Sequence, residues 1–327
     1  MTQNKAMKKF IIKTLIFLIT LIIIISFFEY NLSKVPNAFS VKRELLEKNI
    51  KEVEILVLGS SHTLSGINPT FFDYKGLNMA NTIQSLYYDY QILSKNLDRM
   101  SNLKIVLIPV SYFSLEYNLF NGVQYWRSFF YEKFYKIPPQ IKSKEFDIRR
   151  YSLIALYGGE KSLIWALKRF RVNAAENITE NGFNNMPYNI EQDIKQINNE
   201  SGKNRVFFYN SLMEPGNIPE NIHCLEKIIK ELKDKGVFPV IITTPVYRTY
   251  SDNADIQRYG RLQKNIENLC TNSNIKYFNY FSDPRFVIED FVNDDHLNPK
   301  GAEKFSKIIN EEILKKLLSK DKASLSI

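Results

Sequence analysis

Two stretches far apart in the sequence carry side chains that could perform nucleophilic chemistry. The first is the turn GSSH at 59–62, which directly follows the apolar run 54–58. The second is the polar stretch NDDHLNPKG at 293–301, which contains His296. A serine hydroxyl attacks a carbonyl carbon only when a base accepts its proton, and histidine is the most frequent base. A serine of the first stretch, with His296 of the second as its base, could therefore attack a carbonyl carbon and form an acyl-serine intermediate.

The three histidines of the chain differ in how well they could serve as that base. His62 is the sequence neighbour of the serines, so we expect it to line the pocket rather than to accept the proton. His223 falls near the start of an amphipathic pattern, where packing or capping is the safer interpretation. His296 follows the last predicted strand, and the ends of parallel strands meet at one sheet edge. His296 is therefore the best candidate.

A purely structural interpretation of the same residues also stands. Serine, threonine, asparagine and aspartate are the ordinary capping residues of helices. Ser60 and Ser61 could simply cap the turn that follows them, and Asp294 and Asp295 could cap the last helix. The pattern of strands and helices decides whether the two stretches can meet.

The strands and helices that would position these residues are predicted by apolar runs that alternate with amphipathic helical patterns. The strand candidates are 54–59, 104–110, 236–245 and 275–281, with a weaker fifth at 75–80. Helical patterns cover 84–97, 221–236 and 299–318. Strands that are apolar throughout and alternate with helices indicate a parallel sheet covered on both faces. We therefore expect an α/β fold, a flavodoxin-like three-layer α/β/α arrangement with a mainly parallel sheet.

The N-terminal region predicts one transmembrane helix. In residues 10–28 only Lys13 interrupts an apolar run, and a helix of that length, roughly 28 Å, matches the hydrocarbon core. Four lysines, at positions 5, 8, 9 and 13, crowd the leading side, and Glu29 opens the trailing side. This bias predicts a cytoplasmic N-terminus and an extracytoplasmic remainder. No small-x-small cleavage site follows closely, which favours an uncleaved signal anchor in a single-pass membrane protein.

The predicted organisation has one large domain behind the anchor. We expect a cytoplasmic tail at 1–9, the anchor at 10–28, a linker at 29–52, the domain at 53–320 and a tail at 321–327. An insertion or cap at about 112–220 interrupts the strand and helix alternation. It contains Trp126 and the basic pair Arg149 and Arg150. Aromatic and cationic side chains could hold a glycan there, although the aromatics could also form the core of the insertion.

Composition excludes several classes of protein. The net charge is +9; residues 1–30 supply four lysines and one glutamate, or +3, which leaves +6 for the other 297 residues. No concentrated basic motif predicts a nucleic-acid partner. The two cysteines, Cys224 and Cys270, are expected to be buried apolar residues, with a single bridge left open. HExxH, CxxC, P-loop and GxGxxG motifs are missing from the sequence, so we expect no metal and no cofactor.

The two reactive stretches resemble the SGNH (GDSL-like) hydrolase superfamily. Its members carry a Gly-Asp-Ser turn after the first strand and an Asp-x-x-His near the C-terminus, followed by a Gly-Ala helix start. Ser61 matches the nucleophile, Ser60 stands in the place of the aspartate, and His296 matches the base, with Gly301 and Ala302 behind it. The likeness covers about 53–110 and 221–318 and leaves the insertion unaccounted for.

The resemblance also implies partners for the base and for the oxyanion. Where the family has its aspartate, three residues before His296, this chain has Asn293; we expect Asp294 to orient the imidazole, with Asn293 as its rival. The backbone N–H groups of Ser61 and Ile83 would hold the oxyanion, Ile83 being at the place of a family glycine. Ser111 stands where the family supplies an asparagine. His62, Trp126 and Arg149 are expected in the substrate pocket.

Within the superfamily, the anchor and GSSHT…GINP are similar to membrane-anchored members linked to O-acylation of surface polysaccharide. The resemblance implies a serine esterase or O-acyltransferase, with acetyl as the first candidate group. The expected partners are a cell-surface polysaccharide or its acyl donor, the lipid bilayer and, as a further candidate, a membrane-bound acyltransferase. The alternative is a catalytically silent glycan-binding or assembly subunit of such a complex, which the departures at 60, 83, 111 and 293 favour.

Overall fold

The computed structural model describes residues 2–122, 124–140, 146–158, 160–168, 175 and 177–324. The chain divides into two compact units. The first comprises Met1–Asn37 and Ile141–Ala175, and the second comprises Ala38–Gln140 and Glu176–Ile327.

A parallel sheet forms the centre of the second unit. Its strands are β1 (Ile55–Val57), β2 (Gly76–Asn78), β3 (Ile105–Pro109), β4 (Phe238–Thr243) and β5 (Lys276–Asn279). Within the described part of the chain their order is β2-β1-β3-β4-β5, and every neighbouring pair is parallel. This is the flavodoxin-like strand order. The expected α/β fold with a mainly parallel sheet is therefore confirmed, including the weak fifth strand candidate.

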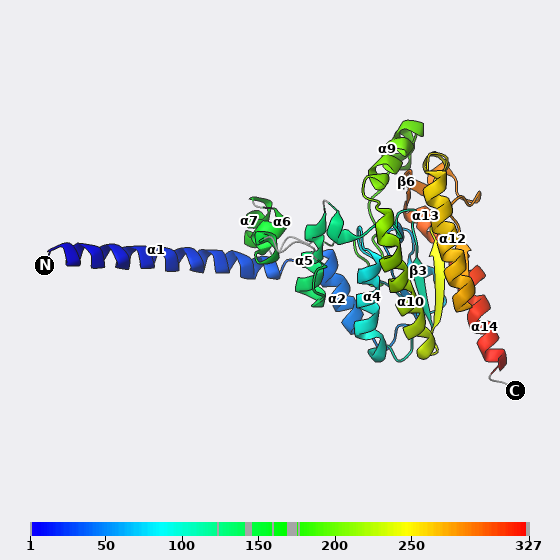
Figure 1. Cartoon of the computed structure of the whole chain (residues 1–327), viewed down its shortest axis with the longest axis horizontal. Coiled ribbons are helices and arrows are strands. Elements are labelled where there is room, and N and C mark those ends of the chain that lie inside the picture. Colours follow the sequence, from blue (N-terminus) through cyan, green and yellow to red (C-terminus); the bar gives the residue numbers. More distant parts are fainter. Residues whose placement is uncertain are drawn as a thin grey trace. The chain divides into compact units, whose positions relative to one another are not determined.

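Helices cover the sheet (Figure 1). The strands alternate with α4 (Leu86–Asn96), α10 (Ile218–Asp234), α12 (Ile256–Ser273) and α13 (Pro299–Ile309). α4 and α10 pack side by side, and α10 also contacts β4. The apolar side chains of α10 recur at helical spacing and are buried at positions 225, 228, 229 and 232. On one sheet face, α13 and the π-helical turn η9 (Asn310–Leu314) share a core with β1, β3 and β4.

Two short elements present the candidate chemistry. The helix α3 (Ser61–Leu64) begins directly after the turn that follows β1. The strands β6 (Phe291–Asn293) and β7 (His296–Leu297) form an antiparallel hairpin that includes His296 of the polar stretch 293–301. Asn298 then caps α13 by accepting the N–H of Gly301. Both elements lie beyond carboxyl ends of sheet strands.

The expected linker at 29–52 is largely helical. α1 (Thr2–Ser33) runs without a break through the expected tail and anchor, and α2 (Ala38–Asn49) follows it. α2 buries Leu46 and Lys42, so it packs as part of the second unit rather than acting as a spacer. Within the described residues, α1 is the one helix long and apolar enough to cross a membrane.

The expected insertion at 112–220 is divided between the two units. Its 141–175 portion belongs to the first unit, and the rest belongs to the second. Within the same insertion, the Asn-rich tract at 173–204 contains α8 (Ile190–Gln196) and the start of α9 (Asn199–Asn210). Asn189 and Asn198 cap these helices, so the asparagines mark helix starts.

Two further predictions concern the cysteines and the C-terminus. Cys224 and Cys270 are buried and unbridged, as expected of small apolar residues. The expected tail at 321–327 begins inside α14 (Lys315–Ser324), and residues 325–327 lie outside the described residues.

Candidate active site

The turn after β1 holds Ser61 in a fixed position. Gly59 has φ +112°, and a Cβ atom there would lie 2.7 Å from Thr63 Oγ1, so only glycine fits this turn. The Gly59 N–H donates to Asp89 Oδ1 at 2.8 Å, which ties the turn to α4. Ser60 is buried, and its hydroxyl makes no hydrogen bond to the residues that the structure describes. Ser61 follows as the first residue of α3.

The structure brings Ser61 and His296 together. The Oγ atom of Ser61 lies 2.9 Å from Nε2 of His296, although 235 residues separate the two in sequence. This distance allows the hydroxyl to donate its proton to the imidazole.

The other ring nitrogen of His296 meets Asp295, which sequence reasoning did not choose. Nδ1 lies 3.0 Å from Asp295 Oδ1 and 3.1 Å from Asn293 Oδ1. Nη2 of Arg205, a donor, also lies 3.1 Å from Nδ1. The two acceptors, one of them an ionised carboxylate, outweigh this contact, so we assign the proton to Nδ1, which leaves Nε2 free to accept the Ser61 proton. Asn293 Oδ1 also accepts the backbone N–H of His296 at 3.0 Å, so this asparagine shapes the turn as well as contacting the ring.

The expected pairing of Asp294 with His296 is corrected by the structure. Asp294 Oδ1 accepts hydrogen bonds from the hydroxyls of Thr249 and Ser201, and Asp294 O accepts the N–H of Tyr247. Successive residues in the tight β6–β7 connection point to different sides. Asp295 therefore faces the imidazole while Asp294 faces α9 and the segment after β4.

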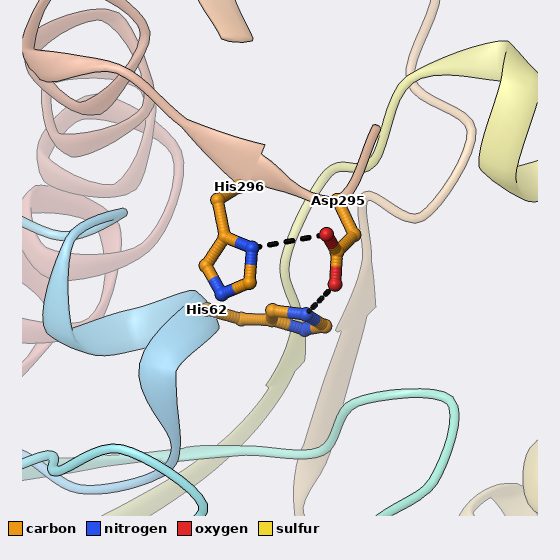
Figure 2. Close-up of side chains that lie close together, drawn as sticks. All are labelled: His62, Asp295 and His296. Atoms are coloured by element: carbon orange, nitrogen blue, oxygen red, sulfur yellow. Dashed lines mark hydrogen bonds and ion pairs between the residues drawn. The ribbon is translucent and has the colours of Figure 1, made fainter. Parts of the chain in front are cut away.

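Asp295 is the most heavily paired group of the site. Its carboxylate is 1% exposed and also binds His62 Nε2 through Oδ2 at 2.8 Å (Figure 2). Arg205, from α9, donates to Oδ1 through Nε at 2.7 Å. Burial alone would raise the pKa of Asp295, but the charge of a protonated His296 and the hydrogen bonds from both imidazoles hold this pKa well below its usual range. The carboxylate therefore stays ionised.

His62 is part of this network and is not a lining residue of the cavity beside Ser61. The side chain is 3% exposed, with Nδ1 2.9 Å from Ser111 Oγ. Burial lowers the pKa of His62 and outweighs the opposing effect of Asp295. A neutral ring that donates from Nε2 to Asp295 must accept at Nδ1, so the Ser111 hydroxyl donates to it.

The three groups expected to bind an oxyanion, on Ser61, Ile83 and Ser111, differ in the hydrogen bonds that they already make. Ile83 has φ +56°, in the left-handed region that β-branched residues rarely adopt. Residues with such strained backbone conformations cluster at functional sites. Ser111 is committed elsewhere, because its hydroxyl bonds to His62 and its N–H donates to Ser114 Oγ at 2.8 Å. The N–H groups of Ser61 and Ile83 remain the candidates for binding an oxyanion.

A cavity of about 240 Å³ opens beside the reactive pair. Besides Ser61, His296 and Arg205, its lining includes the apolar side chains Leu64 and Val292. Trp126, in the turn η4 (Tyr125–Arg127), does not line this cavity, and Arg149 belongs to the other unit, where it pairs with Asp147 at 2.7 Å.

The same side chains could be considered as metal ligands. Ligand atoms of His62, Asp295 and His296 lie within 4.8 Å of one another. They are already paired at 2.8 and 3.0 Å, and the guanidinium of Arg205 occupies the same carboxylate. A divalent cation would have to break these hydrogen bonds and lie beside a fixed positive charge. This donor set fits a proton-transfer network better than a metal centre.

Comparisons with known proteins add little to this geometry. Family models and curated proteins give no match. Among solved structures, the chain is similar to a Bacteroides fragilis protein described as a candidate acylhydrolase, with 10% identity and a TM-score of 0.38. The match covers 83% of this chain and 94% of that one. A TM-score this low carries no argument, so the function is argued from the site itself.

Proposed function

We propose that the chain is an SGNH-like serine esterase or O-acyltransferase, anchored in a membrane, whose catalytic domain acts outside the cytoplasm on cell-surface polysaccharide. The observation that carries the proposal is the 2.9 Å contact between Ser61 Oγ and His296 Nε2. Asp295, at 3.0 Å from the opposite ring nitrogen, completes the arrangement that activates a serine nucleophile.

The reaction would proceed in two balanced halves. His296 accepts the Ser61 proton as Oγ attacks the acyl carbonyl, and the imidazolium then gives that proton to the leaving alkoxide as the acyl-serine forms. In the second half His296 takes a proton from an acceptor hydroxyl or from water as that oxygen bonds to the acyl carbon. The bond between the acyl carbon and Ser61 Oγ then breaks, and His296 returns the proton to Oγ. The N–H groups of Ser61 and Ile83 would hold the oxyanion of each tetrahedral intermediate.

The substrate assignment rests on three supports of different kinds. The cavity of about 240 Å³ suits a short acyl group, with acetyl as the first candidate. The apolar helix α1 would keep the site near a membrane surface. The polysaccharide acceptor rests on the resemblance to anchored O-acylation proteins, and a glycan hydroxyl held beside the acyl-serine would outcompete water through its effective concentration.

A fluorophosphonate probe tests the nucleophile. The full-length chain in detergent should become labelled at Ser61, and Ser61→Ala should abolish labelling because the hydroxyl beside His296 is gone. Ser60→Ala is the matched control: its hydroxyl is buried, so labelling should persist. Peptide mass spectrometry locates the label.

Other outcomes would redirect the proposal. Labelling that survives Ser61→Ala refutes the assignment of Ser61. A folded chain that takes no label and turns over no activated acyl ester, yet binds glycan, would favour the silent binding subunit. An acylated glycan product would favour transferase over esterase.

A further inference from the structure

The first unit packs a helical hairpin against the end of the anchor helix. Its helices are α6 (Leu153–Tyr157) and α7 (Glu160–Leu167), and both contact α1. Glu29 of α1 accepts the backbone N–H of Leu153 at 2.8 Å and that of Ile154 at 3.2 Å. Glu29 directly follows the apolar run 10–28, so this contact fixes the hairpin at the trailing end of the anchor.

The buried face of α7 carries small side chains. Ser162 is 0% exposed and Ala166 is 2% exposed, and the two lie four residues apart on one face of the helix. The Ser162 hydroxyl donates to the carbonyl of Ile154 on α6 at 3.1 Å. Small residues at this spacing allow close helix packing of the kind found in membrane proteins.

The outer face of α7 is mostly apolar, with the exposed Glu160 at its first residue. Leu163, Ile164 and Leu167 are 37%, 45% and 67% exposed. The segment that leads into the hairpin adds Phe146 and Tyr151, at 77% and 65%. A helix that is apolar on both its packed and its exposed faces is typical of surroundings less polar than water.

Basic and aromatic residues flank these apolar side chains. Arg149, which pairs with Asp147, and Arg150 precede α6, and Lys168 follows α7. Between these basic residues in the sequence lie Tyr157 and Trp165, whose ring centroids are 5.7 Å apart. Tyrosine and tryptophan favour the membrane–water interface, and arginine and lysine favour anionic headgroups.

We propose that the described residues between 146 and 168 form an interfacial hairpin that inserts the outer face of α7 into the lipid bilayer, with anionic headgroups around its basic flanks. The inference rests on the proposed membrane span of α1. It gives this part of the insertion a lipid partner, and the anchor a second contact with the same bilayer.

Lipid-depth quenching tests the proposal. The full-length chain, carrying a single introduced cysteine labelled with NBD, is placed in nanodiscs that contain anionic lipid with or without doxyl-labelled acyl chains. Labels at Leu163→Cys and Leu167→Cys should emit blue-shifted light and lose as much emission to doxyl lipid as a label at Phe27→Cys in the anchor. Ile256→Cys, at a position 84% exposed in the other unit, is the control and should show neither effect. The native thiols are buried, and the unmodified parent gives their background.

Each result bears on the inference. Water-like, unquenched emission at 163 and 167 with a quenched Phe27→Cys label overturns the hairpin proposal alone. An unquenched Phe27→Cys label overturns the membrane span and the hairpin with it. Blue-shifted emission at 163 and 167 without quenching would indicate a protein partner and also overturn the lipid assignment. Adding Leu163→Glu and Leu167→Glu should abolish the quenching of a label at Ile164→Cys. Probe labelling of Ser61 reports separately on catalysis.

Discussion

The carboxylate of Asp295 binds three side chains of the site at once. One oxygen binds His296 and Arg205, and the other binds His62. A buried carboxylate with several strong partners stays ionised and rigid. It can therefore stabilise the imidazolium that forms on His296 and keep the ring in its productive tautomer.

This role predicts different effects for two neighbouring aspartates. Asp295→Asn should lower the rate of fluorophosphonate labelling by about 10³- to 10⁴-fold, because the neutral amide loses the charge and favours the wrong imidazole tautomer. Asp294→Asn should leave the rate within a few-fold of that of the parent, because its amide oxygen can still accept from Thr249 and Ser201. Labelling reactions quenched at successive times give the labelling rate constant of each variant.

The melting temperature of each variant serves as the control for folding. An Asp294→Asn variant that melts normally yet reacts as slowly as Asp295→Asn would show that the hairpin is arranged differently during catalysis. Equal rates for Asp295→Asn and the parent would remove Asp295 from the mechanism.

At the scale of elements, a buried carboxyl joins the turn that precedes Ser61 to the turn that precedes α4. Asp89, in the first turn of α4, accepts the Gly59 N–H at 2.8 Å and Gln84 Nε2 at 2.6 Å. Gln84 follows Ile83 in sequence, and its amide oxygen accepts the hydroxyl of Tyr131. Burial raises the pKa of Asp89 to about 7, with the hydrogen bonds from Gln84 and Gly59 opposing this.

The raised pKa predicts a decline of stability with pH. The folded chain keeps a proton on Asp89 that the unfolded chain releases from about pH 4 upward, so the folded state binds more protons in this window. The free energy of unfolding should therefore fall as pH rises from about 4 to 7, by at most about 1.4 kcal/mol per pH unit from this group, and then level off. Asp89→Asn cannot titrate and should lack this component.

Thermal unfolding of the full-length chain in detergent, with parent and Asp89→Asn side by side across this pH range, measures the effect. The melting temperature of the parent should drop relative to that of the variant as pH rises. Parallel curves for the two proteins would contradict a protonated Asp89.

At the scale of the whole molecule, α1 should hold the chain in a membrane. Its helix is apolar along most of its length, and its side chains from position 4 to 27 are exposed. Membranes washed with alkaline carbonate should retain the full-length chain, and protease added from the outside should digest the part after the anchor. Recovery of an intact chain in the wash, or digestion only after the membrane is opened, would contradict the span or its orientation.

The sequence by itself determined the elements and the reactive pair. Apolar runs of strand length between amphipathic helices are strong local signals, because burial on both faces of a parallel sheet requires them. The same topology explains the meeting of Ser61 and His296, since loops after different parallel strands share one edge. The three consecutive polar residues 293–295 gave no signal for which would face the imidazole.

Tertiary structure alone decided that choice and the rest of the network. Asp295 faces His296 because the β6–β7 connection turns it inward, where Arg205 of α9 and His62 of α3 meet the same carboxylate. Arg205 lies in α9, just after the Asn-rich tract, and no motif in the sequence around it marks it as a partner of the site. The division of the insertion between two units is likewise a matter of long-range packing. Periodicity reports which face of an element is buried, but the partner that buries it depends on contacts between distant segments.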